Sequence, residues 1–383
     1  MRMLCSIIGA SLFSLSSLRA AEASLPESLQ QEARAALAKG LAWIAANQKP
    51  DGVWSDEKNP AMTALPLWAL AASGQAQYTS QVDRAVAFIL SKAQPDGGIY
   101  VPDPQRGGAG LGNYNTSLCM MGLHATGRKD VVRAIQKARE YTAATQLTGD
   151  DQHAGGFGYD KGGRRHTDLT NTGMAIDAMR RTQSVEDLRP TGEKRADLNW
   201  DAALKYVENM QQKEGEDQGG FLYTRSFRPG APAPGPGEKR EGPGTAGAER
   251  PRPQLRSYGS ITYVGLLSMV HAQLTRNDPR VLSAFDYCTK HWTLDENPGQ
   301  GGQGLYFYYN VLTRALSAAG IDAIPQPGGS DLAWREALIK KVVGLQQADG
   351  SWVNENNRWW ENDPVLATSY SLLALEFATG LTR

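Results

Sequence analysis

Histidine and acidic side chains gather in one stretch of the sequence, residues 149–168, directly before an apolar segment. His166 and Asp168 lie two residues apart there, and a histidine near a carboxylate can transfer protons in general acid–base catalysis. An aspartate in front of a helix also caps free backbone N–H groups without doing any chemistry. Asp363, just before Pro364, has the same two interpretations. We therefore take Asp168, His166 and Asp363 as candidate catalytic residues, with helix capping as the alternative for the aspartates.

Two aromatic clusters form a candidate binding surface. Trp359 and Trp360 stand in a predicted loop, and four consecutive aromatic residues occupy positions 306–309. Aromatic faces attract cations and stack on sugars, whereas the plain alternative is core packing. Four aromatic residues in a row cannot all face one core. The residues that we predict to bind a ligand are Tyr306, Tyr308, Tyr309, Trp359 and Trp360.

A possible zinc site fails on geometry. Asp286, Cys288 and His291 offer carboxylate, thiolate and imidazole groups, all of which bind zinc. Asp286 and Cys288 are two residues apart on a predicted helix, so their side chains point in different directions. We predict no metal site and no cofactor.

These candidates belong to a sequence that repeats. A polar turn, Gln48-x-x-Asp51-Gly52-x-Trp54, precedes an apolar segment that starts near Thr63, and Gln346-x-x-Asp349-Gly350-x-Trp352 precedes a similar segment at Thr368. A small residue follows each anchor after six positions, and Leu or Met after seven. The anchors are Thr63, Thr116, Thr172, Thr262, Tyr309 and Thr368.

A second, amphipathic helix is predicted before each anchor, over 33–47, 82–92, 131–144, 200–212, 281–291 and 334–346. Charged residues interrupt its apolar positions at helical spacing, so one face should be in water. The anchor segments, such as 62–72 and 366–377, carry few charges and should be buried. Six wet helices outside six dry ones predict a closed all-α (α/α)6 toroid, which has no exposed end repeats.

The turn and its Thr-led helix resemble the repeat of squalene and oxidosqualene cyclases and of protein prenyltransferase β-subunits. The resemblance covers essentially residues 24–383 and implies a central pocket for an isoprenoid or another long apolar ligand. Residues 155–159 and 219–221 keep only the Gly-Gly-aromatic end of the turn, and the copy around 301–306 is weak. The motif is specific for the fold and not for a reaction.

The chemistry of these families is not retained in the motifs. The cyclases use an Asp-x-Asp-Asp motif whose middle acid protonates an alkene or epoxide, which requires a carboxylic acid with a tuned pKa. At the matching place this chain has Asp168-Leu169-Thr170-Asn171, so a threonine replaces that acid. Asn171, in the place of the last acid, remains a candidate ligand-binding residue. The zinc ligands of the prenyltransferases are missing as well.

The remaining segments concern location and partners. Residues 1–23 have a basic Arg2, an apolar Ser-rich stretch and an Ala21-Glu22-Ala23 cleavage pattern, which predict a signal peptide and an exported protein, periplasmic or secreted. No later stretch is long enough for a transmembrane span. With 40 basic and 40 acidic residues and no basic patch, we expect no nucleic-acid partner. Residues 228–254, rich in Pro and Gly, are predicted to be a flexible insertion that a protein partner could bind.

Three functions remain open. The first is a divergent protein that binds or transforms an isoprenoid-like apolar ligand in an aromatic pocket. The second is a toroid without enzymatic activity that mediates protein interaction, with a centre that is shallow or filled by side chains. The third is a polysaccharide lyase or glycosidase, for which Asp150, Asp151, Arg165 and Asp168 are the available groups.

Overall fold

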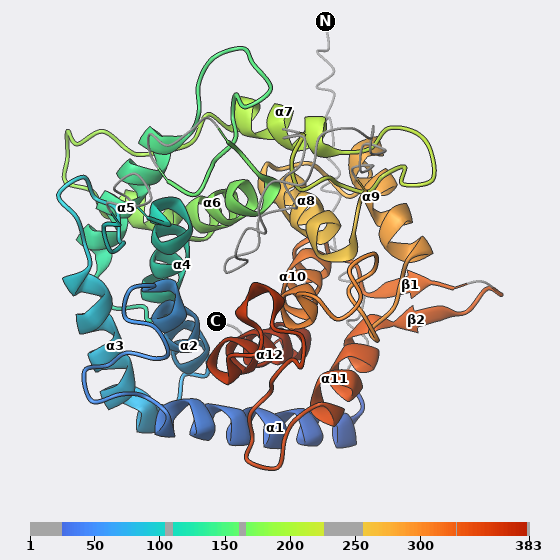
Figure 1. The fold of residues 1–383 in the computed structure, drawn as a ribbon, viewed down its shortest axis with the longest axis horizontal. Helices are drawn as coiled ribbons and strands as arrows, with labels where there is room; N and C mark the ends of the chain where they lie inside the picture. The colour runs from blue at the N-terminus through green and yellow to red at the C-terminus, as the bar shows by residue number, and fades with distance from the viewer. Residues whose placement is uncertain (1–24, 104–109, 161–165, 226–255, 327, 381–383) are drawn as a thin grey trace, which may run out of the picture.

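The computed structural model describes residues 25–103, 110–160, 166–225, 256–326 and 328–380. The predicted signal peptide and the whole of the predicted insertion lie outside these residues. Within them, long helices alternate along the chain between an outer and an inner ring (Figure 1). The outer helices are α1 (Glu27–Ala46), α3 (Thr79–Ser91), α5 (Val132–Thr145), α7 (Trp200–Met210), α9 (Pro279–Lys290) and α11 (Trp334–Gly344). The inner helices are α2 (Ala61–Ala72), α4 (Gly112–Ala125), α6 (Leu169–Arg181), α8 (Gly259–His271), α10 (Leu305–Ala318) and α12 (Pro364–Thr379).

The inner ring is closed. Each inner helix contacts the next one along the chain, and the last, α12, contacts the first, α2. In the outer layer α1 contacts α11, so the first and last repeats are neighbours there too. The all-α (α/α)6 toroid is confirmed. A short antiparallel hairpin, β1 (Ala323–Pro325) and β2 (Asp331–Ala333), leads into α11 and projects from the ring (Figure 1).

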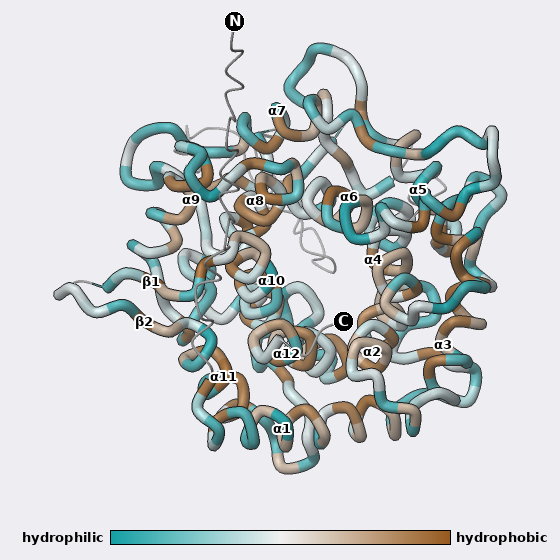
Figure 2. Tube along the Cα trace, turned by 180° about the vertical axis from the view of Figure 1, so that it is seen from behind, coloured by the Kyte–Doolittle hydropathy of each residue, from teal (hydrophilic) through white to brown (hydrophobic). Residues whose placement is uncertain are grey.

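Burial separates the two layers as the periodicity predicts. Nearly all residues of α2, α8 and α12 are buried, whereas α3 and α7 are buried along one face. Hydrophobic residues lie mainly on the helices, and the connections around the rim are largely hydrophilic (Figure 2). No helix in the described part of the chain is both long and apolar enough to span a bilayer.

The anchor threonines hold the repeat motif onto the inner helices. Each side-chain oxygen accepts a hydrogen bond from the backbone N–H at the motif's last position, over 2.9–3.3 Å. The pairs are Thr63 with Trp54, Thr116 with Ile99, Thr172 with Phe157, Thr262 with Phe221, and Thr368 with Trp352. Tyr309 in the fifth repeat differs, because its hydroxyl donates to the carbonyl of Leu294 over 2.5 Å.

In the last repeat the motif glutamine connects the turn to another outer helix. The Gln346 side chain donates to Gly350 O in its own turn and to Ala36 O on α1, each over 2.9 Å. Gly350 adopts φ +96°, and an added Cβ would lie 2.8 Å from Lys39 O of the same helix, so a glycine is required there. The last turn is thereby fastened to the first helix of the chain.

The third and fourth repeats retain this glutamine, which corrects the reading that only their Gly-Gly-aromatic ends survive. Gln146 donates to Gly155 O and Asn199 O, and Gln211 donates to Gly219 O and Arg280 O. In both repeats extra residues separate the glutamine from its glycine, and this insertion hides the motif in the sequence.

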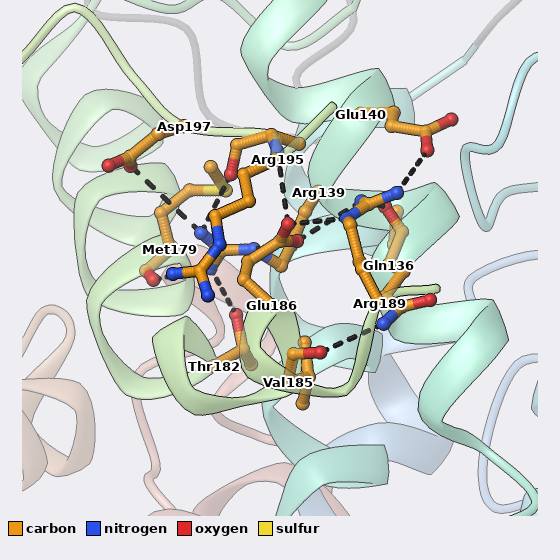
Figure 3. Close-up of polar contacts among 12 residues, drawn as sticks. Gln136, Arg139, Glu140, Met179, Thr182, Val185, Glu186, Arg189, Arg195 and Asp197 are labelled. Atoms are coloured by element: carbon orange, nitrogen blue, oxygen red, sulfur yellow. Dashed lines mark hydrogen bonds and ion pairs between the residues drawn. The ribbon is translucent and has the colours of Figure 1, made fainter. Parts of the chain in front are cut away.

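A buried ion network fixes the long connection between α6 and α7 (Figure 3). Glu186, in the short 3-10 helix η3 (Gln183–Leu188), lies between Arg139 on α5 and Arg189. The Arg139 Nε–Glu186 Oε1 distance is 2.8 Å, and Arg139 also donates to Met179 O and Ala196 O. Burial alone would raise the pKa of Glu186, but the bonds from Arg189 and Ala196 and the nearby guanidiniums hold it below its usual value. The network joins α5 to the connection between α6 and α7.

Candidate functional site

A cavity of about 490 Å³ lies where the inner helices begin. Each inner helix contributes a residue from its first turns or its N-cap to the wall. They are Met62, Leu111, Asn171, Ser260, Phe307 and Leu366. The volume is within the range of small-molecule sites in proteins.

Eight aromatic rings among the described residues line the cavity. They come from helices and loops far apart in the sequence: Tyr114, Tyr159, Tyr223, Tyr258, Phe307, Trp359, Trp360 and Tyr370. Arg358 is the one basic residue among the described lining residues, and its guanidinium lies 5.2 Å from the centre of the Trp359 ring. The wall therefore combines eight aromatic residues with nine polar or charged ones, and among the described lining residues only one is basic.

Trp359 and Trp360 both line this cavity, as predicted for a ligand-binding surface, although binding itself stays a prediction. Both residues have φ 62°, a left-handed conformation that is costly for side chains other than glycine. They belong to the short turn η4 (Arg358–Trp360), which leads to Glu361. The local backbone is strained where it presents the two rings to the cavity.

Tyr306, Tyr308 and Tyr309 do not line the cavity, contrary to the predicted role. All three are buried, and their hydroxyls donate to the backbone carbonyls of Val353, Thr293 and Leu294. Phe307, between them, reaches the cavity instead. Successive residues of a helix point about 100° apart, so only one member of this run faces the cavity.

Asp168 is the N-cap of α6. It is fully buried, and Oδ1 accepts from the Asn171 backbone N–H while Oδ2 accepts from the Asn171 side-chain amide, both over 2.8 Å. Burial raises the pKa of Asp168 to about 6, although hydrogen bonds from Asn171 and Tyr223 act in the opposite direction. Capping is thus observed, and the carboxylate itself is not part of the cavity wall.

Hydroxyl groups connect Asp168 to the cavity. Tyr223 bonds to Asp168, and the Tyr159 hydroxyl lies 3.1 Å from that of Tyr223. Both tyrosines line the cavity, as does Asn171. The predicted candidate Asn171 therefore lies between the buried carboxylate and the cavity.

The other predicted catalytic residues lie elsewhere. Asp363 caps α12, because Oδ1 accepts from the Val365 N–H over 2.9 Å, and Oδ2 accepts from Ser55. His166 is outside the set of cavity residues, and it is His153 that bonds to the hydroxyl of Thr167, over 2.8 Å. The structure does not bring His166, Asp168 and Asp363 together around the cavity.

Glu361 is a buried carboxylate in the wall that the sequence interpretation missed. It accepts hydrogen bonds from Phe307 N (2.7 Å) and Tyr306 N (3.2 Å), and so caps α10 from a distant loop. Asn354 donates to it as well, over 2.8 Å. Burial raises the pKa of Glu361, while these bonds act to lower it. Glu361 lies at the start of α10 in the folded protein but is far from it in the sequence. No local sequence pattern therefore indicates this capping role.

A charged cluster fills the ring further along the inner helices. Asp177 on α6 pairs with Arg314 on α10, with Arg181 (2.8 Å) and with His271 on α8 (2.8 Å). Both guanidiniums lie 5.3 Å from the Trp68 ring on α2. We call Asp177, Arg181, Arg314, His271 and Trp68 the central cluster. The side-chain-filled centre expected for a non-enzymatic toroid is thus present here, but not where the cavity lies.

The described residues contain no group of three or more His, Cys, Asp or Glu side chains that could hold a metal ion. Cys288 is buried and its thiol lies beside the Tyr263 hydroxyl. Burial raises the pKa of Cys288 to about 12, so this thiol is not poised to be a thiolate.

Solved structures share this fold. A single-residue variant of the type II terpene cyclase MstE from Scytonema, in complex with its product merosterolic acid A, aligns over 93% of this chain and 100% of its own, with 12% identity and a TM-score of 0.56. The complex of another variant with the substrate geranylgeranyl dihydroxybenzoate gives 12% identity, coverages of 93% and 100%, and a TM-score of 0.54.

Another similar structure is that of a mannanase. An inactive variant of the α-1,6-mannanase GH76A of Salegentibacter, in complex with α-1,6-mannotriose, covers 92% of this chain and 99% of its own, with 12% identity and a TM-score of 0.54. No protein-family profile matches the sequence, and no curated protein matches it. The likeness establishes the terpenoid cyclase-like α/α toroid and leaves the ligand open.

Proposed function

We propose that this protein binds a largely apolar, isoprenoid-like molecule in the cavity at the N-terminal ends of the inner helices. The observation that carries the proposal is the wall itself, in which aromatic rings from α4, α10, α12 and the connecting loops surround about 490 Å³. Burying apolar surface against such rings is the dominant favourable contribution to binding. One of the similar structures holds a geranylgeranyl compound in a toroid of the same kind.

Binding is better supported than cyclisation. A proton donor must reach the reacting carbon, and Asp168 is covered by its bonds to Asn171 and Tyr223. At the neighbouring position that the cyclase motif assigns to an acid stands Thr170, which lines the cavity. Any transformation of the ligand has to use groups other than a directly exposed Asp168.

A saccharide is the rival ligand, because Trp359, Trp360 and the carboxyl group of Asp160 share the wall. Of the acids that the sequence offered for polysaccharide chemistry, Asp150 and Asp151 are exposed and outside the wall, and Asp168 serves as a cap. Arg165 is outside the described residues. The apolar ligand is therefore the better match to the groups that face the cavity.

The test is native mass spectrometry of the purified protein after incubation with a lipid extract, squalene, prenyl alcohols and α-1,6-mannotriose in parallel. We expect a retained isoprenoid whose amount falls at least tenfold in Phe307→Ala. The matched control is Phe285→Ala, because Phe285 is half-buried on the outer helix α9, away from the cavity. Retention of mannotriose alone, or of nothing, rejects the proposal.

We also propose that the protein is exported after removal of residues 1–23 and that residues 228–254 contact a protein partner. The sequence supports both points through the basic and apolar pattern of the N-terminus and the Pro/Gly composition of the insertion. N-terminal sequencing of protein from each cell fraction tests export. Loss of co-purifying protein after deletion of 228–254 tests the partner.

A further inference from the structure

We propose that the ligand carries a hydroxyl group at one end, and that the side-chain oxygen of Asn171 accepts its proton. This inference rests on the proposed function and specifies the chemistry of the molecule in the same cavity. It follows from the way in which the hydrogen-bond donors near Asp168 are already used.

The carboxylate of Asp168 accepts hydrogen bonds from the polar side chains around it. Its Oδ2 accepts the Asn171 side-chain N–H over 2.8 Å, and the carboxylate also bonds to the Tyr223 hydroxyl. The Asn171 amide is oriented by the first of these bonds, so its oxygen, Oδ1, points away from Asp168. The only proton on the Tyr223 hydroxyl is used in the second.

The side-chain oxygen of Asn171 is left without a donor. The Tyr159 hydroxyl lies 3.1 Å from the Tyr223 oxygen and also beside the Asn171 amide. In the structure, Asn171 Oδ1 is buried and has no hydrogen-bond partner. A buried acceptor without a donor is costly, and buried polar groups in folded proteins are nearly always satisfied.

A ligand hydroxyl resolves this shortage. Asn171, Tyr159 and Tyr223 all line the cavity, so a bound molecule can bring a donor to them. Tyr258 also lines the cavity close to Tyr159 and Asp168, and its hydroxyl can donate to the ligand oxygen in return. The aromatic wall away from this point receives the apolar part of the molecule.

The same charges disfavour a diphosphate. Glu361 and Asp160 are in the wall, and among the described lining residues only Arg358 is basic. Diphosphates are bound by clusters of Arg and Lys or by metal ions, and the described residues of the wall contain no such cluster and no group of ligands for a metal ion. A pure hydrocarbon would leave Asn171 Oδ1 unsatisfied.

The experiment is a set of equilibrium Kd measurements on the wild-type protein with three probes that share one chain: geranylgeraniol, its methyl ether and geranylgeranyl diphosphate. The methyl ether keeps the oxygen and lacks the proton, so the ratio of its Kd to that of the alcohol isolates the donor. We expect the alcohol to bind about tenfold tighter than the ether, which corresponds to about 1.4 kcal/mol. The diphosphate should bind more weakly than the alcohol.

Variants assign the effect to residues. Asn171→Leu, close in shape, should reduce the alcohol preference about threefold or more, whereas Thr170→Val, which removes a neighbouring hydroxyl from the same wall, should preserve it. Thermal unfolding of both variants checks that they fold. If Asn171→Leu does not fold, the ratio of the ether Kd to the alcohol Kd in the wild-type protein still tests whether the ligand donates a proton.

Each outcome has one meaning. Equal affinity for alcohol and ether, or tightest binding of the diphosphate, overturns the hydroxyl inference and leaves the proposed function standing. Failure of every probe to bind overturns both. An alcohol preference that survives in Asn171→Leu, or that falls equally in Thr170→Val, overturns the assignment to Asn171.

Discussion

Arg314 on α10 forms an ion pair with Asp177 on α6, although α8 stands between these helices in the inner ring. Arg181 and His271 share the same carboxylate, so Asp177 neutralises more than one buried cation. The pair is buried on both sides and lies against Trp68. The central cluster therefore ties together inner helices that are not neighbours.

Asp177→Asn is expected to destabilise the protein more than Arg314→Met. Loss of the carboxylate leaves two guanidiniums without a counter-charge, at a cost of about 3–5 kcal/mol. Loss of Arg314 leaves Asp177 paired with Arg181 over 2.8 Å and should cost less. Urea unfolding of both variants gives the two free energies, and the reverse ranking would contradict the role given to Asp177.

Asp168→Asn should change how stability depends on pH. The folded protein raises the pKa of Asp168 to about 6, above the value of about 3.9 in an unfolded chain, so the protonated acid is favoured by folding. This contribution is complete below about pH 4 and is lost as the pH rises through about 6. Over that window wild type should lose about 3 kcal/mol relative to the variant, which does not titrate there.

The measurement for Asp168 is the free energy of unfolding of both proteins at several pH values from 4 to 8. Asparagine is also a good helix cap, so the variant should fold. A constant difference between the two proteins across this range would show that Asp168 is not perturbed.

Gln346→Ala should loosen the junction between the last turn and α1. Its side chain donates to Ala36 O and Gly350 O, and leaving these carbonyls without a donor should cost about 1–3 kcal/mol. Gln347→Ala is the control, because that neighbouring side chain is exposed and should change stability by less than about 0.5 kcal/mol. Equal effects in denaturant unfolding would show that the bond to α1 contributes nothing.

Gly155→Ala should be among the more damaging single changes in the third repeat. Gly155 has φ +85°, and an added Cβ would lie 1.9 Å from Ala202 O on α7, so the turn and the helix must separate. Gly127→Ala is matched for conformation, with φ +63° and open space around the added atom, and should cost only the left-handed strain of about 1–2 kcal/mol. Equal melting temperatures for the two variants would contradict close packing at Gly155.

The fold was predictable because its determinants are local and repeated. The turn at Gln48–Trp54, the Thr-led helix after it and the amphipathic helix before it recur along the chain in the same order. Gln146 and Gln211 escaped notice because 9 and 8 positions, instead of 4, separate each from the glycine whose carbonyl it binds. Spacing is variable where the intervening residues form an exposed loop, while the bond itself is kept.

The cavity was less predictable because its residues share no sequence neighbourhood. Tyr159 and Tyr223 each stand two residues after a motif aromatic, Phe157 and Phe221, and this recurrence is a signal that could have identified them. The run at 306–309 attracted attention by composition, but helical geometry turns three of its four rings into the core. Glu361 reaches α10 through the tertiary structure alone.

Closure of the ring brings residues of the first and last repeats into the wall of one cavity. Met62, from the first repeat, and Tyr370, from the last, line one cavity, and α12 must reach α2 before that cavity exists. A ribosome-bound chain without its last helix therefore has no site to occupy. A molecule that contacts both residues would oppose separation of the first and last repeats. A ligand of this cavity is therefore expected to stabilise the closed ring and to slow proteolysis at the junction between the first and last repeats.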